Sequence, residues 1–512
     1  MEENKMSKGK EILAILLLTM VIGTGTLAWI VWSSKDNTKM NVTIGDLADV
    51  SFKTGNDINI SNLSPSFYYD DGALTEFSIR KKKGLTTELN TSIYLDITSI
   101  SDELKNDNFK YVLLSSSDGN TYNEVISSSF KDASIGKLSI VTDNPLTDGK
   151  TYYKFYIWID GNNENNETMQ GKSLKGTLNV DVSTPPVNAV TLVEGLNKGE
   201  TGDSGSGVYK VTHDAITAGS SATGSEIPAV TDYRYYGKSP NNYICLDMEG
   251  GSTCPDKHLY RIIGSIYEEK ENTNRIKVIK ATPLTDGTTN WFSWDYTSSG
   301  SSDNIWATAT SGNYSNSLTS GSQLMKLLNS GAWWNGTSGS YYNNSTTATN
   351  VNFTNYKLSD KAKSYITTSR YYLGGYNSSN ILTSAMYGYE RGTNSSATSR
   401  PLYWDGMVGL IYPSDYGYAA GNTCVTGTTL YNYGGGCKNK GWFYNTKEQW
   451  LVTPNSLARY SCVFYIYSDG KIGYFGDDNT QFAKFVHPVF FLTSTTSIID
   501  GDGTLNNPYI LK

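Results

Sequence analysis

The sequence predicts a multi-domain protein with an N-terminal membrane-spanning helix, an all-β sandwich and a larger α+β domain with long ordered loops. Three observations predict this organisation: an uncharged apolar run over residues 12–32, regularly spaced strand-like runs over 41–184, and few regular segments over 233–512. A chain of 512 residues is also too long for one compact hydrophobic core. We therefore expect each part to fold around its own core.

The first 33 residues predict a short cytoplasmic segment followed by a membrane anchor. As a helix, residues 12–32 would reach about 30 Å, the thickness of a bilayer core. Positive charge before the helix keeps the N-terminus in the cytoplasm, and tryptophans suit its outer end. The residues concerned are Lys5, Lys8, Lys10, Trp29 and Trp32.

A cleaved signal peptide is the alternative for this segment, with Thr26-Leu27-Ala28 as the cleavage site. The apolar run is longer than the usual core of a signal peptide, which favours a retained helix. Both alternatives place the rest of the chain outside the membrane. We expect a single-pass cell-membrane protein whose bulk is extracellular.

The composition is typical of a binding surface. The chain has 38 Tyr and 49 Gly against only 15 Phe, and charged residues make up 18%. Tyrosine offers contact area and a hydroxyl at low entropic cost, while Ser, Gly and Asn adapt to a ligand. The net charge of −7 argues against nucleic acid as a partner, because such proteins carry a basic footprint.

The five cysteines predict two disulfides. Cys245 and Cys254 are close in sequence, as are Cys424 and Cys437, and short loops of this kind close readily in an oxidising compartment. Cys462 is then left over. Zinc is a weaker alternative because no CxxC motif or histidine cluster accompanies the cysteines. We expect no metal and no cofactor.

Residues 41–184 predict a β-sandwich, since short strands alternate with Gly/Asn/Asp turns. The strand-like runs are 92–98, 110–114, 137–141, 152–159 and 176–182. The segments 151–161 (TYYKFYIWIDG), 171–174 (GKSL) and 23–29 (GTGTLAW) resemble the TasA/camelysin-like surface proteins of Firmicutes. The resemblance implies a jelly-roll-like sandwich that acts as an assembly or spacer module.

Residues 185–232 predict a linker, because Pro185-Pro186 cannot donate to a sheet and a Gly/Ser/Thr-rich stretch follows. The final domain, 233–512, contains strands predicted over 259–266 and 276–280. Two helices are also predicted, one over 323–328 and one over 360–367 capped by Ser359.

Several motifs in this last domain share their order with one known family. They are 408–418 (VGLIYPSDYGY), Cys424, Cys437, 450–454 (WLVTP) and 487–492 (HPVFFL). Together they resemble C-type-lectin-like domains of the formylglycine-generating-enzyme subtype, in which an Arg is commoner at the position of His487. In several bacterial surface proteins such domains are targets of diversity-generating retroelements.

A tyrosine-rich hairpin over 462–475 is the candidate ligand-binding site. Asp469-Gly470 favours a two-residue turn. That register pairs Ile466 with Gly473 and Phe464 with Phe475 on a buried face. The other face would expose Tyr465, Tyr467 and Tyr474, with further contacts from the flanking residues Arg459, Tyr460, Asp477, Asp478, Asn479, Phe482 and Lys484.

These features predict a cell-surface binding protein rather than an enzyme. Its ligand would be an extracellular protein or a glycan. Its three histidines, His213, His258 and His487, come with no nucleophile elbow, HExxH motif or phosphate loop. Variation in the interval around the hairpin is a further hypothesis that the family resemblance suggests. The alternative function is a structural surface or matrix component that assembles through the β-sandwich.

Overall fold

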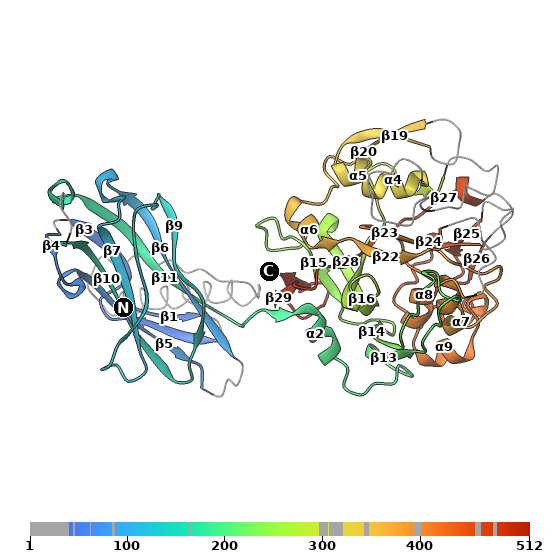
Figure 1. Cartoon of the computed structure of the whole chain (residues 1–512), viewed down its shortest axis with the longest axis horizontal. Coiled ribbons are helices and arrows are strands. Elements are labelled where there is room, and N and C mark those ends of the chain that lie inside the picture. Colours follow the sequence, from blue (N-terminus) through green and yellow to red (C-terminus); the bar gives the residue numbers. More distant parts are fainter. Residues whose placement is uncertain are drawn as a thin grey trace, which may run out of the picture. The chain divides into compact units, whose positions relative to one another are not determined.

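The computed structural model describes residues 40–44, 47–61, 63–83, 88–162, 166–295, 306, 321–342, 348–393, 401–455, 462–474 and 479–512. The chain divides into two compact units, Met1–Pro185 and Pro186–Lys512, coloured blue to green and green to red (Figure 1). The predicted membrane helix over 12–32 lies outside the described residues. Within the described ranges, no helix is both long and apolar enough to span a bilayer.

The first unit contains two sheets. One runs β1-β2-β5-β10-β7-β8, with the short β4 pairing parallel to β10, and the other runs β3-β11-β6-β9 (Figure 1). All five predicted strand-like runs fall inside these strands. The strands are β1 (Met40–Ile44), β2 (Ala48–Phe52), β3 (Asp57–Ser61), β4 (Pro65–Ser66), β5 (Ala73–Lys81), β6 (Leu89–Ile100), β7 (Phe109–Ser116), β8 (Asn123–Ser129), β9 (Gly136–Leu146), β10 (Lys150–Asp160) and β11 (Ser173–Ser183), with short 3-10 helices η1 (Tyr69–Asp71), η2 (Asp102–Leu104) and η3 (Asn166–Met169).

The two sheets of this unit share one hydrophobic core, to which strand alternation directs every second side chain. On β10, Phe155 and Ile157 enter this core with Leu95 of β6 and Leu178 of β11. The opposite face of β10 carries Tyr156 and Trp158, which form a second, smaller cluster with Val112 and Leu114 of β7. One sheet therefore carries aromatic side chains on its outer face as well.

The second unit is built on a ten-stranded sheet of order β12-β29-β30-β15-β16-β17-β28-β21, with β14 attached to β16 and β13 to β14. The two strands predicted over 259–266 and 276–280 are present as β16 and β17. The sheet comprises β12 (Val187–Asn188), β13 (Gly207–His213), β14 (Val230–Tyr236), β15 (Tyr243–Cys245), β16 (Leu259–Glu268), β17 (Thr273–Lys280), β21 (Ile366–Thr367), β28 (Val489–Leu492), β29 (Ser497–Asp500) and β30 (Tyr509–Leu511).

Residues 185–232, predicted as a linker, belong instead to this second unit. β12 pairs with β29, helix α2 (Ala189–Gly195) follows, and β13 pairs with β14 over seven residues. The apolar residues Val193 and Val208 are buried in the main core. Most of the Gly and Ser residues of this segment lie in the turns between these elements. They dominate its composition, so the composition alone does not reveal the buried valines. The prolines do mark the boundary between the units.

The remaining elements of the second unit are short. The predicted helix over 323–328 is present as α4, where Ser322 caps the first turn, and Ser359 caps the helix predicted over 360–367, which ends earlier, at Ser364. The helices are α4 (Gln323–Asn329), α5 (Ala332–Asn335), α6 (Asp360–Ser364), α7 (Thr383–Glu390), α8 (Pro413–Ala419), α9 (Asn422–Gly427), η4 (Asp256–His258), η5 (Leu430–Asn432) and η6 (Asn479–Gln481).

Small sheets and buried tryptophans fill the space between these helices. Trp294 packs against Trp306 and Trp450, with ring centroids 5.0 and 5.9 Å apart. The small sheets are formed by β18 (Phe292–Ser293), β19 (Ser338–Tyr342), β20 (Ala348–Asn352), β22 (Ser369–Tyr372), β23 (Tyr403–Gly406), β24 (Gln449–Pro454), β25 (Val463–Ile466), β26 (Ile472–Gly473) and β27 (Ala483–Lys484).

Both predicted disulfides are present. Cys245 bonds to Cys254 and Cys424 bonds to Cys437, and the Cα atoms of each pair are 5.8 Å apart. Cys462 is buried and takes part in neither disulfide. The oxidised cysteines are consistent with an extracellular compartment.

Candidate functional site

The predicted hairpin is present, but its turn differs from the prediction. β25 and β26 pair Tyr465 with Gly473 and Ile466 with Ile472. The Tyr467 N–H donates to the Lys471 carbonyl over 2.9 Å, which leaves a three-residue loop closed by Gly470 at φ +87°. The predicted two-residue turn is therefore wrong, and so is the register that paired Ile466 with Gly473. A three-residue loop ending in a left-handed glycine suits the same Asp-Gly sequence.

Both faces of this hairpin are buried. Phe464 and Ile466 pack into one core cluster, as expected for the apolar face. Tyr474 also packs on this side, with its ring centroid 5.6 Å from that of Phe464, so the prediction that it shares a face with Tyr465 is wrong. Tyr465 belongs to the main core on the other face and is only 3% exposed, so the prediction that it faces solvent is wrong. The reason is that β24 continues the sheet and packs Trp450 against Tyr465, with ring centroids 5.9 Å apart.

Lys484 lies over the buried face of the hairpin. Its ammonium is 3.7 Å from the centroid of the Tyr465 ring and 2.7 Å from the Glu448 carboxylate. Burial lowers the pKa of Lys484, and the bond to Glu448 opposes that shift. Burial likewise raises the pKa of the Tyr465 hydroxyl. With Lys484 only 6% exposed, the structure gives Tyr465 and Lys484 a supporting position beneath the surface.

Tyr467 of the predicted tyrosine row is partly exposed. Its ring stacks on Tyr465 at 4.2 Å, and the Lys471 ammonium lies 4.5 Å from its centroid. Gly473 makes room for it, because a Cβ there would lie 3.0 Å from the ring. The same ammonium lies 5.7 Å from the ring of Tyr431, which is 51% exposed. A cation therefore lies between two accessible tyrosines.

Tyr431 was not among the predicted site residues. It lies in η5, inside the loop closed by the Cys424–Cys437 disulfide, and the nearby Tyr433 is fully buried. A loop sequence has no periodicity, so it does not indicate which of two neighbouring tyrosines is exposed and which is buried. Only the cysteine spacing could have pointed to an ordered loop here.

We call the residues at the end of the hairpin the hairpin-tip surface. The Tyr444 hydroxyl donates to the Ser468 carbonyl over 2.7 Å, and the Asp469 carboxylate lies 3.5 Å from the Lys471 ammonium. The surface mixes aromatic rings, hydroxyls and charges of both signs around Lys471. It comprises Tyr431, Tyr444, Tyr467, Asp469 and Lys471.

The other predicted site residues are placed apart from this tip. Tyr474 is half-buried and donates its hydroxyl to the Asn377 carbonyl over 3.0 Å. Phe482 is 44% exposed, and it lies between η6 and β27. Asn479 begins η6, but its side chain is not described. Arg459, Tyr460, Asp477 and Asp478 lie outside the described residues.

A buried ionic network fixes the helix that supports the tip. Asp415 of α8 accepts from Arg234 over 2.9 Å and from Lys277 over 2.6 Å, and all three side chains are buried. Burial would raise the pKa of Asp415, but the two cations together lower it. The next residue, Tyr416, donates its hydroxyl to the Gly470 carbonyl over 2.8 Å. The network thus holds the hairpin turn through α8.

One group of metal-type ligands occurs among the described residues. Donor atoms of Asp247, Glu249 and His258 lie within 4.8 Å of one another. The Glu249 carboxylate already contacts Lys257 over 2.8 Å and His258 over 3.1 Å, and Asp247 accepts from Ser359. Hydrogen bonds and ion pairs within the protein therefore account for the grouping.

The sequence matches no protein-family model, and no curated protein matches it either.

Proposed function

We propose that this chain is a cell-surface protein that binds an extracellular protein or glycan through the hairpin-tip surface of a C-type-lectin-like second unit. One observation carries the proposal: the Lys471 ammonium lies between the accessible rings of Tyr467 and Tyr431. Tyrosines present apolar area and a hydroxyl together, which suits them to partner contacts. Lys471 and Asp469 add charge of both signs.

A rigid frame supports this use of the surface. The tip is held by Tyr416 and Tyr444 through hydrogen bonds to main-chain carbonyls, and Tyr431 lies in a disulfide-closed loop. A surface already fixed in its binding geometry loses little conformational entropy when a ligand binds. Binding then needs no catalytic group and no cofactor.

The other parts of the proposal concern how the surface is displayed. The first unit would act as a TasA/camelysin-like spacer, and the N-terminal helix would anchor the chain in the cell membrane. We also propose that the interval 455–487 is a variable region of the retroelement type. A near-copy of its codons beside a reverse transcriptase gene would support that, and a genome without one would contradict it.

Binding by soluble extracellular protein, residues 34–512, to arrays of glycans and of surface proteins tests the main proposal. The test variant combines Tyr431→Ser, Tyr467→Ser and Lys471→Ala, and the control is Leu505→Ser, another exposed apolar residue of the same unit. We expect the affinity of the triple variant for the ligands found on the arrays to fall about 10-fold or more, since central aromatic residues dominate binding energies. Equal binding by the triple variant and the wild type would show that the surface is wrong.

Assembly through the first unit is the second candidate function, because β9 is an eleven-residue edge strand. Its pairing with β6 has irregular register, and it contains Lys137 and Pro145. Irregular pairing, lysine and proline all disfavour addition of a further strand. Binding is therefore the better supported function. Sedimentation of the extracellular protein separates the two, since a stable monomer counts against assembly.

A further inference from the structure

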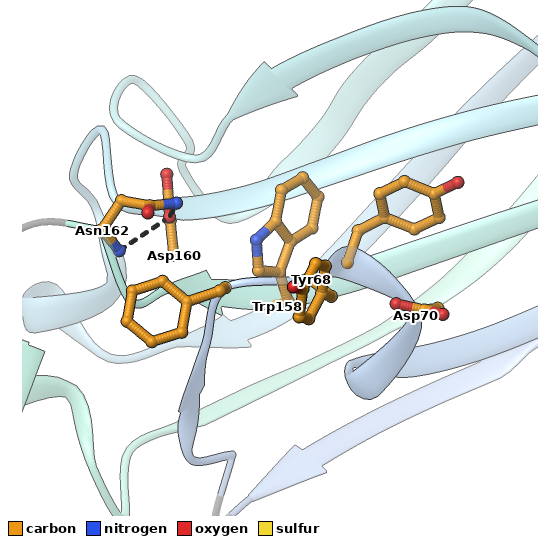
Figure 2. Close-up of a pocket in the computed structure, with 7 residues that line it drawn as sticks. Tyr68, Asp70, Trp158, Asp160 and Asn162 are labelled. Atoms are coloured by element: carbon orange, nitrogen blue, oxygen red, sulfur yellow. Dashed lines mark hydrogen bonds between the residues drawn. The ribbon is translucent and has the colours of Figure 1, made fainter.

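A second candidate site lies in the first unit, away from the hairpin. Residues of the η1 segment and of the end of β10 line a hollow of about 450 Å³. Figure 2 shows the Trp158 indole in its middle, with Asp160 and Asn162 on one side and Asp70 on the other. Phe67, Tyr68 and Tyr69 complete the lining, and Phe67 and Tyr68 are 68% and 69% exposed.

The backbone holds these aromatic residues in place. β4 pairs with the end of β10, and the Gly161 N–H donates to the Ser66 carbonyl over 2.8 Å. Gly72 brings the end of η1 against β10, since a Cβ there would lie 2.4 Å from the Ile157 carbonyl oxygen. The Tyr69 ring meets the Trp158 ring edge-on at 6.1 Å. The exposed rings therefore belong to an ordered turn.

The lining is acidic as well as aromatic. It includes the carboxylates of Asp70 and Asp160 and no cationic side chain. Asp160 accepts from Lys110 over 2.5 Å and from Asn162, so its charge is largely compensated. Asp70 is exposed at the rim. Together, the ring faces and this carboxylate make the hollow electronegative.

We propose that this hollow binds an organic ammonium group. Cations are attracted to the faces of Trp and Tyr rings, and aromatic pockets recognise quaternary ammonium groups in this way. Asp70 supplies the compensating charge. A neutral sugar could also stack on Trp158, but it gains no Coulombic attraction from the exposed Asp70 carboxylate, whereas an ammonium does. This proposal is independent of the hairpin-tip surface in the second unit.

The ammonium group that suits these ring faces best is a trimethylammonium, as in a choline headgroup, because aromatic pockets recognise quaternary ammonium groups. Saturation-transfer NMR with the purified full chain compares choline, a short lysine-containing peptide and two neutral probes. The neutral probes are glucose and the carbon isostere of choline, in which a tert-butyl group replaces the trimethylammonium. Saturation of choline without the peptide supports a trimethylammonium ligand, and equal or stronger saturation of the peptide would assign the hollow to a lysine on a partner protein instead.

The test variants are Tyr68→Ser and Asp70→Asn, both at exposed positions. Each should weaken binding of the ammonium probe about 3-fold, the size of an exposed cation–π contact or ion pair. The matched controls, Ile135→Ser and Asp102→Asn, change an exposed apolar residue and an exposed aspartate elsewhere in the same unit and should leave binding unchanged.

Three results would overturn the proposal. The first is no saturation of either ammonium probe, and the second is equal saturation of choline and its neutral isostere. The third is loss of binding in the control variants to the same extent as in the test variants. Preferential binding of glucose would assign the hollow to a sugar instead.

Discussion

Replacing His487 by Asn should remove part of the acid sensitivity of the second unit. The imidazole is buried, and its Nδ1 lies 2.8 Å from the Lys280 carbonyl oxygen. Its Nε2 is also buried and has no hydrogen-bond partner in the part of the chain that the structure describes. Protonation would therefore place a charge and an unsatisfied N–H in the core. Burial accordingly lowers the pKa of His487 to about 4, although the Lys280 carbonyl opposes the shift.

The size of the effect follows from that pKa. The imidazole has an ordinary pKa of 6.5 when the chain is unfolded. Below pH 6.5 the unfolded chain binds a proton that the folded one rejects, so the stability contribution is complete above pH 6.5. It is lost as the pH falls to about 4. At about 1.4 kcal/mol per pKa unit, the whole loss is roughly 3 kcal/mol, of which about 2 kcal/mol has gone by pH 5.

Urea unfolding of wild type and His487→Asn at pH 7, 6 and 5 measures this contribution. Tryptophan fluorescence reports mainly on the second unit, because most tryptophans of the chain follow Pro186. Asn cannot titrate, and its amide can still donate to the Lys280 carbonyl. The other titrating groups are shared, so the difference between the two curves isolates His487. We expect the wild type to lose about 2 kcal/mol more than the variant between pH 7 and 5, and parallel losses would refute the argument.

Three further substitutions test the frame of the second unit. Asp415→Asn removes the anion that buried Lys277 contacts, although Arg234 keeps its pair with Asp232, and should cost about 3 kcal/mol in urea unfolding. Lys257→Ala at a more exposed ion pair of the same unit should cost under about 1 kcal/mol, and equal costs would contradict this reasoning. Replacing Cys245 and Cys254 by Ser opens a short loop and should cost about 3 kcal/mol, with no loss contradicting the disulfide. Gly470→Ala forces a side chain into left-handed backbone and should cost about 1 kcal/mol or more, and an unchanged stability would contradict a left-handed conformation at this position.

Local signals in the sequence predicted several features correctly. The prolines at 185 and 186 mark the unit boundary, the cysteine spacing gave both disulfides, and Ser359 caps its helix. Each feature depends on residues that are close in sequence. Such short-range effects can be predicted from the sequence without knowledge of the tertiary structure.

The errors arose where distant segments decide the outcome. Strand alternation gave the buried side of Phe464 and Ile466, but it could not show that Trp450 and Lys484 cover the opposite side. The Asp-Gly pair fits loops of two or three residues, so the register depended on tertiary packing. The segment predicted as a linker was misjudged because its buried apolar residues are scattered among turn glycines and show no periodic pattern.

The contacts that hold the hairpin tip have a consequence for how its sequence can change. Tyr416 and Tyr444 donate to the carbonyls of Gly470 and Ser468, which every amino acid possesses. Support of this kind depends on the path of the chain and not on the side chains that the loop carries. Ser468 can therefore be replaced while both hydrogen bonds persist, whereas the Asp469 carboxylate also accepts from the Lys471 N–H of the loop over 3.1 Å. At position 468 the main chain thus fixes the shape of the tip and leaves the side chain open to substitution.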